Sequence, residues 1–247
     1  MIRAISFDLW DTIVVDDSDE LERAALGLLS KHDERRALLH AAVPHRELSD
    51  VVAACDEVDT AFRYAWKVEH TNWTVDARLR RVFERLGEQP SEAAFQAAVE
   101  GWETMELLHS PRLIDGAAEA IAALASRYPL AICSDAIVSP GRVLRQLLEK
   151  HGVKQYFSSF VFSDEVGRSK PHRSMFDAAA AGLGVPVETM VHIGDRHSND
   201  IDGPHQLGMK AILFTASRDA DKAGHSADAL CEAYADLPGV IDALARG

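Results

Sequence analysis

The sequence predicts an α/β protein with a Rossmann-like core of parallel strands and an all-helical cap domain inserted into it. Across residues 111–247, short apolar segments typical of buried strands alternate with segments that have helical spacing. Such alternation implies a parallel sheet with right-handed crossovers. Residues 16–110 instead carry helical spacing and no convincing strand. We therefore assign residues 1–15 and 111–247 to the core and residues 16–110 to the cap.

The predicted strands of the core are short apolar runs that end at polar or turn residues. They are Ile2–Leu9, Leu130–Ser134, Phe160–Ser163, Met190–Ile193 and Lys210–Phe214. The predicted helices have apolar residues three and four positions apart, and several end before a glycine. They are Asp115–Tyr128, Pro140–His151, His172–Leu183, a helix near Asp200–Leu207 and a last helix near Leu237–Ala245. We expect Asp115 to cap the first of these helices, because its carboxylate can accept the free N–H groups there.

The cap segment is expected to hold about four helices, with a break at Gly87–Pro90. Its aromatic and basic residues allow two interpretations. Trp66 and Trp73 could line a substrate pocket, but we expect them to pack between cap helices. Arg35 and Arg36 point in different directions on a helix, so at most one could bind an anionic substrate group, and we expect both to be exposed to solvent.

Composition and charge exclude several classes of protein. The chain has 247 residues and a formal net charge of −13, which argues against nucleic acid as a partner because phosphate backbones require clustered Lys and Arg. No run approaches the ~18 apolar residues of a membrane-spanning helix, so no membrane partner is expected. The cysteines are scattered and show no paired metal spacing, which is typical of a reduced cytoplasm. Composition leaves the oligomeric state open.

Polar residues follow the ends of three predicted strands, where an open parallel sheet gathers its ligand groups. Asp8 lies at the end of the first strand, and Ser134 and Asp135 lie at the end of the second. Lys170 follows a polar loop and precedes a proline. The fourth predicted strand leads into a further polar cluster, made of Asp195, Asn199 and Asp200. Because the carboxyl ends of parallel strands meet at one edge of a sheet, we expect these side chains to converge.

These motifs, in this order, resemble the haloacid dehalogenase superfamily of hydrolases, in the subgroup with a helical cap after the first strand. The resemblance implies that Asp8 is the nucleophile, that Ser134 donates to a phosphoryl oxygen, and that Lys170 pairs with the nucleophile and the phosphoryl group. It also implies a Mg²⁺ ion, whose ligands would be Asp8, the backbone carbonyl of Trp10, Asp195 and Asp200. Asp135 and Asn199 are expected to orient these groups or to touch the substrate.

The position two residues after Asp8 departs from the family pattern. Phosphatases of this family carry a second aspartate there as general acid and base, whereas this chain has Trp10, which cannot transfer a proton. Asp11 is one residue further on, and in an extended chain it leaves the opposite face, so we do not expect it to replace the missing acid. Acid catalysis contributes roughly 10²–10⁴-fold, so the sequence argues against esters with poor leaving groups as substrates.

We therefore predict a Mg²⁺-dependent phosphohydrolase that forms an aspartyl-phosphate on Asp8 and acts on a small, anionic, phosphorylated substrate. One alternative is a 2-haloacid dehalogenase, since relatives with that activity have an aromatic residue at the position of Trp10 and use no metal. The other is a protein of this fold that binds ligands without catalysis. Phosphonate cleavage would require a cap lysine, and neither Lys31 nor Lys67 lies in a context typical of one. Asp195 and Asp200 favour the phosphohydrolase, because such a cluster would repel a haloacid carboxylate.

Overall fold

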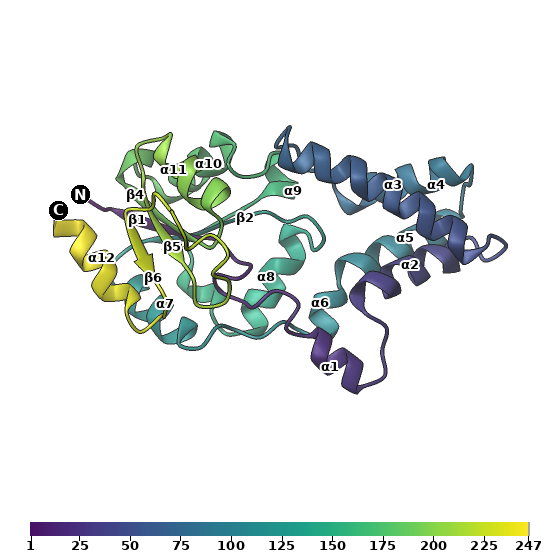
Figure 1. Cartoon of the computed structure of the whole chain (residues 1–247), viewed down its shortest axis with the longest axis horizontal. Coiled ribbons are helices and arrows are strands. Elements are labelled where there is room, and N and C mark those ends of the chain that lie inside the picture. The colour runs from purple at the N-terminus through teal and green to yellow at the C-terminus, as the bar shows by residue number, and fades with distance from the viewer. Residues whose placement is uncertain (247) are drawn as a thin grey trace.

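The computed structural model describes residues 1–246 and contains a six-stranded parallel sheet at one end of the molecule (Figure 1). The strands are β1 (Ala4–Phe7), β2 (Leu130–Ser134), β3 (Ser159–Phe162), β4 (Met190–Gly194), β5 (Lys210–Phe214) and β6 (Ala229–Cys231). Their order is β3-β2-β1-β4-β5-β6, and each neighbouring pair is parallel. The strand order reverses beside β1, which is the point where open α/β sheets bind their ligands. The predicted α/β, Rossmann-like fold class is confirmed.

Helices cover both faces of this sheet, so its central strands are buried along their whole length. On one face, α7 (Ala117–Ala125), α8 (Gly141–Lys150) and α12 (Leu237–Arg246) share a hydrophobic cluster with β1 and β2. On the other face, α10 (Arg173–Leu183) packs through Met175 and Phe176 in a second cluster. The remaining short helices are α9 (Ser163–Val166) and α11 (Gly203–His205), the 3₁₀ turns Lys154–Tyr156 and Val187–Thr189, and a π-helical turn at His197–Asp202.

Seven α-helices lie between β1 and β2 in the chain, and the first six form a separate group beside the sheet (Figure 1). They are α1 (Glu20–Ala25), α2 (Lys31–Ala42), α3 (Leu48–Lys67), α4 (Val75–Leu86), α5 (Glu92–Glu103) and α6 (Met105–Leu108). We call this segment, Glu20–Leu108, the helical insertion. It has its own hydrophobic cluster, in which Leu39, Leu79 and Trp102 are buried away from the core of the sheet. None of its residues belongs to the six-stranded sheet.

Several boundaries differ from the sequence prediction. β1 is shorter than Ile2–Leu9, because its pairing with both neighbours ends at Phe7, where the chain turns into the site. The helix predicted to start at Asp115 starts at Ala117, and its N-cap is Gly116. Gly116 takes a left-handed conformation with φ of 79°, which glycine adopts without steric cost, so Asp115 does not cap the helix.

The segment Asp200–Leu207 was predicted to be one helix, but it does not form a single helix in the structure. The π-helical turn His197–Asp202 comes first, and only three residues of α11 follow it. The irregular turn forms because the Asp200 carboxylate accepts the backbone N–H of Arg196 at 2.9 Å. β6 was also not predicted, because three residues are too few to give an alternating pattern. Within residues 1–246, no helix is long and apolar enough to cross a membrane.

Candidate active site

The predicted site residues meet at the carboxyl edge of the sheet. Asp8 follows β1, Ser134 ends β2, and Asp195 follows β4. We call Asp8, Asp195 and Asp200 the acidic cluster. Each residue contributes one carboxylate oxygen, these oxygens lie within 4.8 Å of one another, and all three residues are buried. Lys170 Nζ lies 2.8 Å from Asp8 Oδ1 and 2.5 Å from Asp200 Oδ1. The sheet edge therefore brings together the acidic cluster and the lysine that the sequence placed far apart.

Asp200 reaches this cluster because residue 194 has no side chain. A Cβ on Gly194 would lie 2.3 Å from Cγ of Asp200, so any other residue would displace the carboxylate. His192 lies 3.1 Å from Asp200 Oδ1 through Nε2, and its Nδ1 lies 2.8 Å from Ser6 Oγ. We assign the ring proton to Nε2, because a carboxylate can only accept. His192 also contacts Phe176 of α10, and its role in holding Asp200 is not evident from the sequence.

The buried charges shift one another's pKa values. Burial alone would lower the pKa of Lys170, but Asp200 and Asp8 outweigh it and raise this pKa well above its usual range. Burial would raise the pKa of Asp200, yet Lys170 and His192 hold it below its ordinary value. Burial, with the charges of Asp200 and Asp8, raises the pKa of Asp195 to about 8. Lys170 is thus an ammonium and Asp200 a carboxylate, while Asp195 lacks sufficient positive charge nearby.

The donor set of this acidic cluster fits a Mg²⁺ ion. Asp195 Oδ1 is buried and has no hydrogen-bond partner within residues 1–246. The other oxygen, Oδ2, accepts a long hydrogen bond from Arg218 at 3.4 Å and lies 3.8 Å from Arg196. A divalent cation would supply a partner for the free oxygen and the positive charge that the cluster lacks. The residues that could hold it are Asp8, Asp195 and Asp200, with the carbonyl of Trp10 as a further predicted ligand.

Ser134 and Asp135 lie at the end of β2, on the wall of the same pocket. The Ser134 hydroxyl is fully buried and has no partner in the described part of the chain, so it is free to donate to a ligand. Asp135 Oδ1 accepts the backbone N–H of Lys170 at 2.9 Å. Its Oδ2 accepts the Trp66 indole N–H at 2.9 Å and the Asn199 amide at 3.5 Å. Burial raises the pKa of Asp135 to about 6 despite these donors. Asn199 therefore contacts Asp135, not the metal-binding carboxylates.

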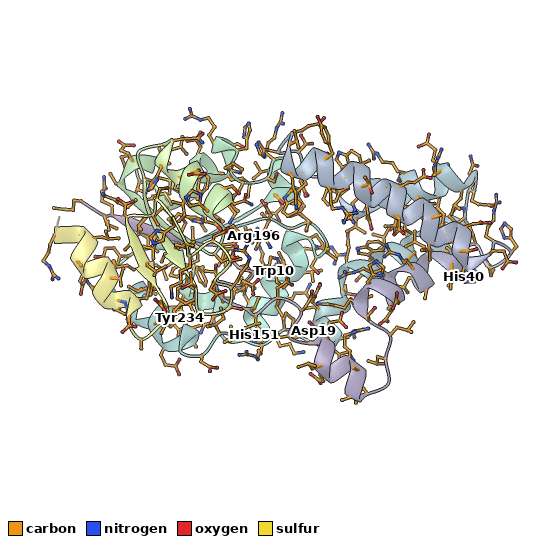
Figure 2. All side chains as sticks on the ribbon, viewed as in Figure 1. Trp10, Asp19, His40, His151, Arg196 and Tyr234 are labelled. Atoms are coloured by element: carbon orange, nitrogen blue, oxygen red, sulfur yellow. The ribbon has the colours of Figure 1, made fainter. Side chains whose placement is uncertain are left out.

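A pocket of about 220 Å³, partly open to solvent, connects the acidic cluster to the helical insertion. Its sheet side carries the predicted site residues Asp8, Trp10, Ser134, Asp135, Lys170, Asn199 and Asp200. Its far end is lined by Asp16, Asp17, Arg35 and Glu106, whereas Trp66 lies against Asp135 on the sheet side. Arg35 donates to Glu106 at 3.0 Å, so its charge is already balanced. Figure 2 shows Trp10 and Arg196 on the side of the core that faces the helical insertion.

Three expectations about the side chains of the insertion are wrong. Trp66 does not pack between helices, because its indole N–H reaches into the pocket. Arg35 lines the pocket and Arg36 is buried in an ion pair, so neither is a solvated surface residue. Trp73 does pack inside the insertion, with its ring centre 5.9 Å from that of Phe62, as predicted. Helical spacing identifies the buried face of each helix, but it does not say which of these faces meets the sheet.

The position of the usual second aspartate is occupied by Trp10, which lines the pocket. Asp11 turns away from it, with a positive φ of 53°. Its Oδ1 accepts the hydroxyl of Ser217 at 2.7 Å and the backbone N–H of Asp16 at 3.3 Å. Asp11 is absent from the residues that line the pocket, which agrees with the expectation that it does not replace the missing acid.

The sequence also missed two arginines near the acidic cluster. Arg218 donates to the backbone carbonyl of Asp195 at 3.0 Å and to the Asp221 carboxylate at 2.8 Å. Arg196 lines the pocket beside the same cluster. A single arginine in a polar loop carries no signal that separates it from a solvated residue, so only the folded chain reveals these contacts.

Comparison with known proteins agrees with the fold and the motifs. The family described as haloacid dehalogenase-like hydrolase matches residues 2–208. The haloacid dehalogenase-like hydrolase domain-containing protein 3 of Xenopus laevis is 29% identical over 142 residues, which are 58% of this chain and 57% of that protein. A glyceraldehyde 3-phosphate phosphatase of Methanopyrus kandleri is 31% identical over 103 residues, which are 41% of this chain and 44% of that enzyme. The chain thus spans about half the length of the curated relatives it matches.

Among solved structures, a 2-haloacid dehalogenase from Pseudomonas syringae pv. Tomato DC3000 superposes with a TM-score of 0.70 and 22% identity, over 99% of this chain and 100% of that one. At this identity the likeness shows the fold alone. The family match covers most of the chain and includes the strand ends that carry Asp8, Ser134 and Asp195. The chain therefore belongs to the haloacid dehalogenase-like hydrolase family.

Proposed function

We propose that this protein is a Mg²⁺-dependent phosphohydrolase that forms an aspartyl-phosphate on Asp8. The observation that carries the proposal is the acidic cluster, in which oxygens of Asp8, Asp195 and Asp200 lie within 4.8 Å of one another beside Lys170. Three carboxylates around one ammonium suit a divalent cation and a phosphoryl group better than a carboxylate substrate. The similarity to a phosphatase over part of the chain supports the same reaction class.

Each residue of the site has a defined role in this proposal. Asp8 would attack phosphorus while the leaving group departs, and water would then hydrolyse the aspartyl-phosphate. Lys170 pairs with Asp8 and presents positive charge to the phosphoryl oxygens, and Ser134 donates its free hydroxyl to one of them. When bound, Mg²⁺ supplies positive charge between the two anionic reactants. Asp135 fixes the backbone of Lys170.

The pocket determines which esters this site can hydrolyse. Trp10 stands where a proton donor is usual, and Asp11 is bonded to Ser217 outside the pocket. We therefore propose that substrates have leaving groups that depart without protonation, or carry their own acid. We also propose that residues 16–110 act as a cap that sets substrate choice, since Trp66, Arg35 and Glu106 of this segment line the pocket.

The test is hydrolysis of p-nitrophenyl phosphate, whose leaving group needs little protonation, with Mg²⁺ and with EDTA. We expect turnover with Mg²⁺, loss of turnover in EDTA, and loss in Asp8→Asn. Full activity in EDTA or in the Asp8→Asn variant would overturn the proposal.

A second candidate is a 2-haloacid dehalogenase, favoured by the aromatic side chain of Trp10 in the pocket. In that case Asp8 would attack carbon and release halide, which needs neither a proton donor nor a metal. Chloride release from L-2-chloropropionate in EDTA would support it. If neither assay shows product while Mg²⁺ or phosphate still binds, the protein is a ligand-binding member of the family without catalysis.

A further inference from the structure

A second cleft opens beside the catalytic pocket. We call it the basic cleft and define it by Lys67, His70, Arg196, Arg218 and Asp221, together with the shared wall described next. Trp66, Lys170, Arg196 and Asn199 line both the cleft and the pocket. A molecule whose phosphoryl group lies at Asp8 could therefore extend past Trp66 into this cleft.

Two cations of the cleft, Lys67 and Arg196, are largely uncommitted, whereas Arg218 is paired with Asp221. Lys67 Nζ lies 5.7 Å from the centre of the Trp66 ring and has no carboxylate within 4.0 Å among the described residues. Within residues 1–246, the guanidinium of Arg196 makes no hydrogen bond, and its nearest carboxylate oxygen is 3.8 Å away. His70 Nδ1 is buried and also lacks a partner in this part of the chain. In a protein with a net charge of −13, the two cations Lys67 and Arg196 at one place attract an anion to this cleft.

The far end of the catalytic pocket has the opposite character. It carries Asp16, Asp17 and Glu106, and the cations beside them are already paired, Arg35 with Glu106 and Lys31 with Asp17. An anionic group would be repelled at that end and attracted in the basic cleft. The far end of the pocket and the basic cleft thus differ in charge, although both adjoin Lys170.

We propose that the basic cleft binds a second anionic group on the leaving group of the substrate, such as a carboxylate. This inference rests on the proposed phosphohydrolase function. The phosphoryl group occupies the acidic cluster with its cation, and the leaving group runs along the face of Trp66. Its anionic end then lies between Lys67 from the helical insertion and Arg196 from the core.

The test compares two phosphate esters that differ only at the far end, 3-phosphoglycerate with a carboxylate and glycerol 1-phosphate with a hydroxymethyl group. Affinity is read as KM where the ester is hydrolysed, and otherwise as the inhibition constant against p-nitrophenyl phosphate with Mg²⁺. We expect the carboxylate ester to bind at least about tenfold more tightly at low salt, with the preference falling as ionic strength rises. Lys67→Gln and Arg196→Gln should each reduce this preference several-fold. The matched control Lys154→Gln, which removes the same charge from an exposed site outside the cleft, should leave it unchanged.

Equal affinities for the two esters, or a preference that neither variant reduces, would overturn the assignment of the cleft. Failure of the proposed function gives a different result, because the wild-type protein would then not hydrolyse p-nitrophenyl phosphate at all. In that event, calorimetric titration of the same two esters into the Mg²⁺-loaded protein decides the inference about the cleft by itself. The carboxylate preference and its loss in Lys67→Gln would support the cleft, and the absence of a preference would contradict it.

Discussion

The helical insertion and the sheet edge treat buried charge in different ways. In the insertion, buried cations have carboxylate partners, as where Arg78 donates to Asp59 at 2.7 Å. At the sheet edge, three carboxylates surround Lys170, and one oxygen of Asp195 has no partner within residues 1–246. A buried charge with a partner helps to fix the position of the chain. A surplus of buried charge of one sign raises the free energy of the folded protein, and a ligand of opposite charge can remove this cost. The ion pairs of the insertion thus support the fold, whereas the uncompensated carboxylates at the sheet edge favour the binding of a cationic ligand.

The largest expected effect concerns the candidate nucleophile. Asp8→Asn keeps the size of the side chain but removes its charge, and we expect kcat for p-nitrophenyl phosphate to fall by at least about 10³-fold. The matched control is Asp11→Asn, whose carboxylate accepts from Ser217 and does not line the pocket, so its kcat should stay within a few-fold of wild type. Similar losses in the two variants would show that the acidic segment as a whole, and not Asp8, is needed.

Substitution of one buried cation in each region tests this difference directly. Lys170→Met removes the ammonium between Asp8 and Asp200, and Arg78→Met removes the nearer of the two arginines that contact Asp59. Each should lower the free energy of unfolding by about 3 kcal/mol in EDTA, because it leaves carboxylates without a counter-charge. Mg²⁺ should restore much of the loss in Lys170→Met and none in Arg78→Met, as measured by urea denaturation. Equal recovery in both variants would remove the distinction between the two regions.

The pH dependence of metal binding comes next in size. Because the pKa of Asp195 is raised to about 8 in the folded, metal-free protein, Mg²⁺ must displace a proton from it below that pH. We expect the affinity for Mg²⁺ to fall about tenfold for each pH unit from pH 8 toward pH 6. Titration calorimetry at several pH values measures this slope, and Asp195→Asn should bind weakly with a much flatter profile. A slope near zero in the wild-type protein would contradict the surplus of negative charge.

The same raised pKa affects stability with a definite sign. An aspartate whose folded-state pKa lies above its unfolded value stabilises the fold below about pH 4, and this contribution is lost as the pH rises through about 8. The free energy of unfolding of the metal-free protein should therefore fall over this interval, and Mg²⁺ should reduce the fall. Denaturation curves in EDTA and in Mg²⁺ across this pH range check both statements.

The smallest expected effect lies at the contact between the two regions. Trp66→Phe removes the indole donor to Asp135 and should lower kcat/KM about fivefold, the equivalent of one hydrogen bond of about 1 kcal/mol. Trp73→Phe is the control, because Trp73 packs on Phe62 inside the insertion and is remote from the pocket. If both variants keep wild-type kcat/KM, the Trp66 contact does not position the site.

Much of the core could be predicted from the sequence. The central strands are buried on both faces and read as apolar runs, and in a parallel sheet their carboxyl ends share one edge. This rule is enough to bring Asp8, Ser134 and Asp195 together without knowledge of the packing. The π-helical turn that presents Asp200 was missed, because it depends on the bond to the backbone of Arg196 and on the absence of a side chain at Gly194.

The sequence by itself therefore determined the sheet, the family and the acidic cluster, since strand periodicity and motif order are local signals. Only the tertiary structure decided the surroundings of that cluster. It brought Trp66 onto Asp135, buried Arg35 against Glu106, and placed Lys67 and Arg196 in one cleft. These contacts join residues far apart in the chain through the orientation of whole helices, and helical spacing shows which face is buried but not what it is buried against.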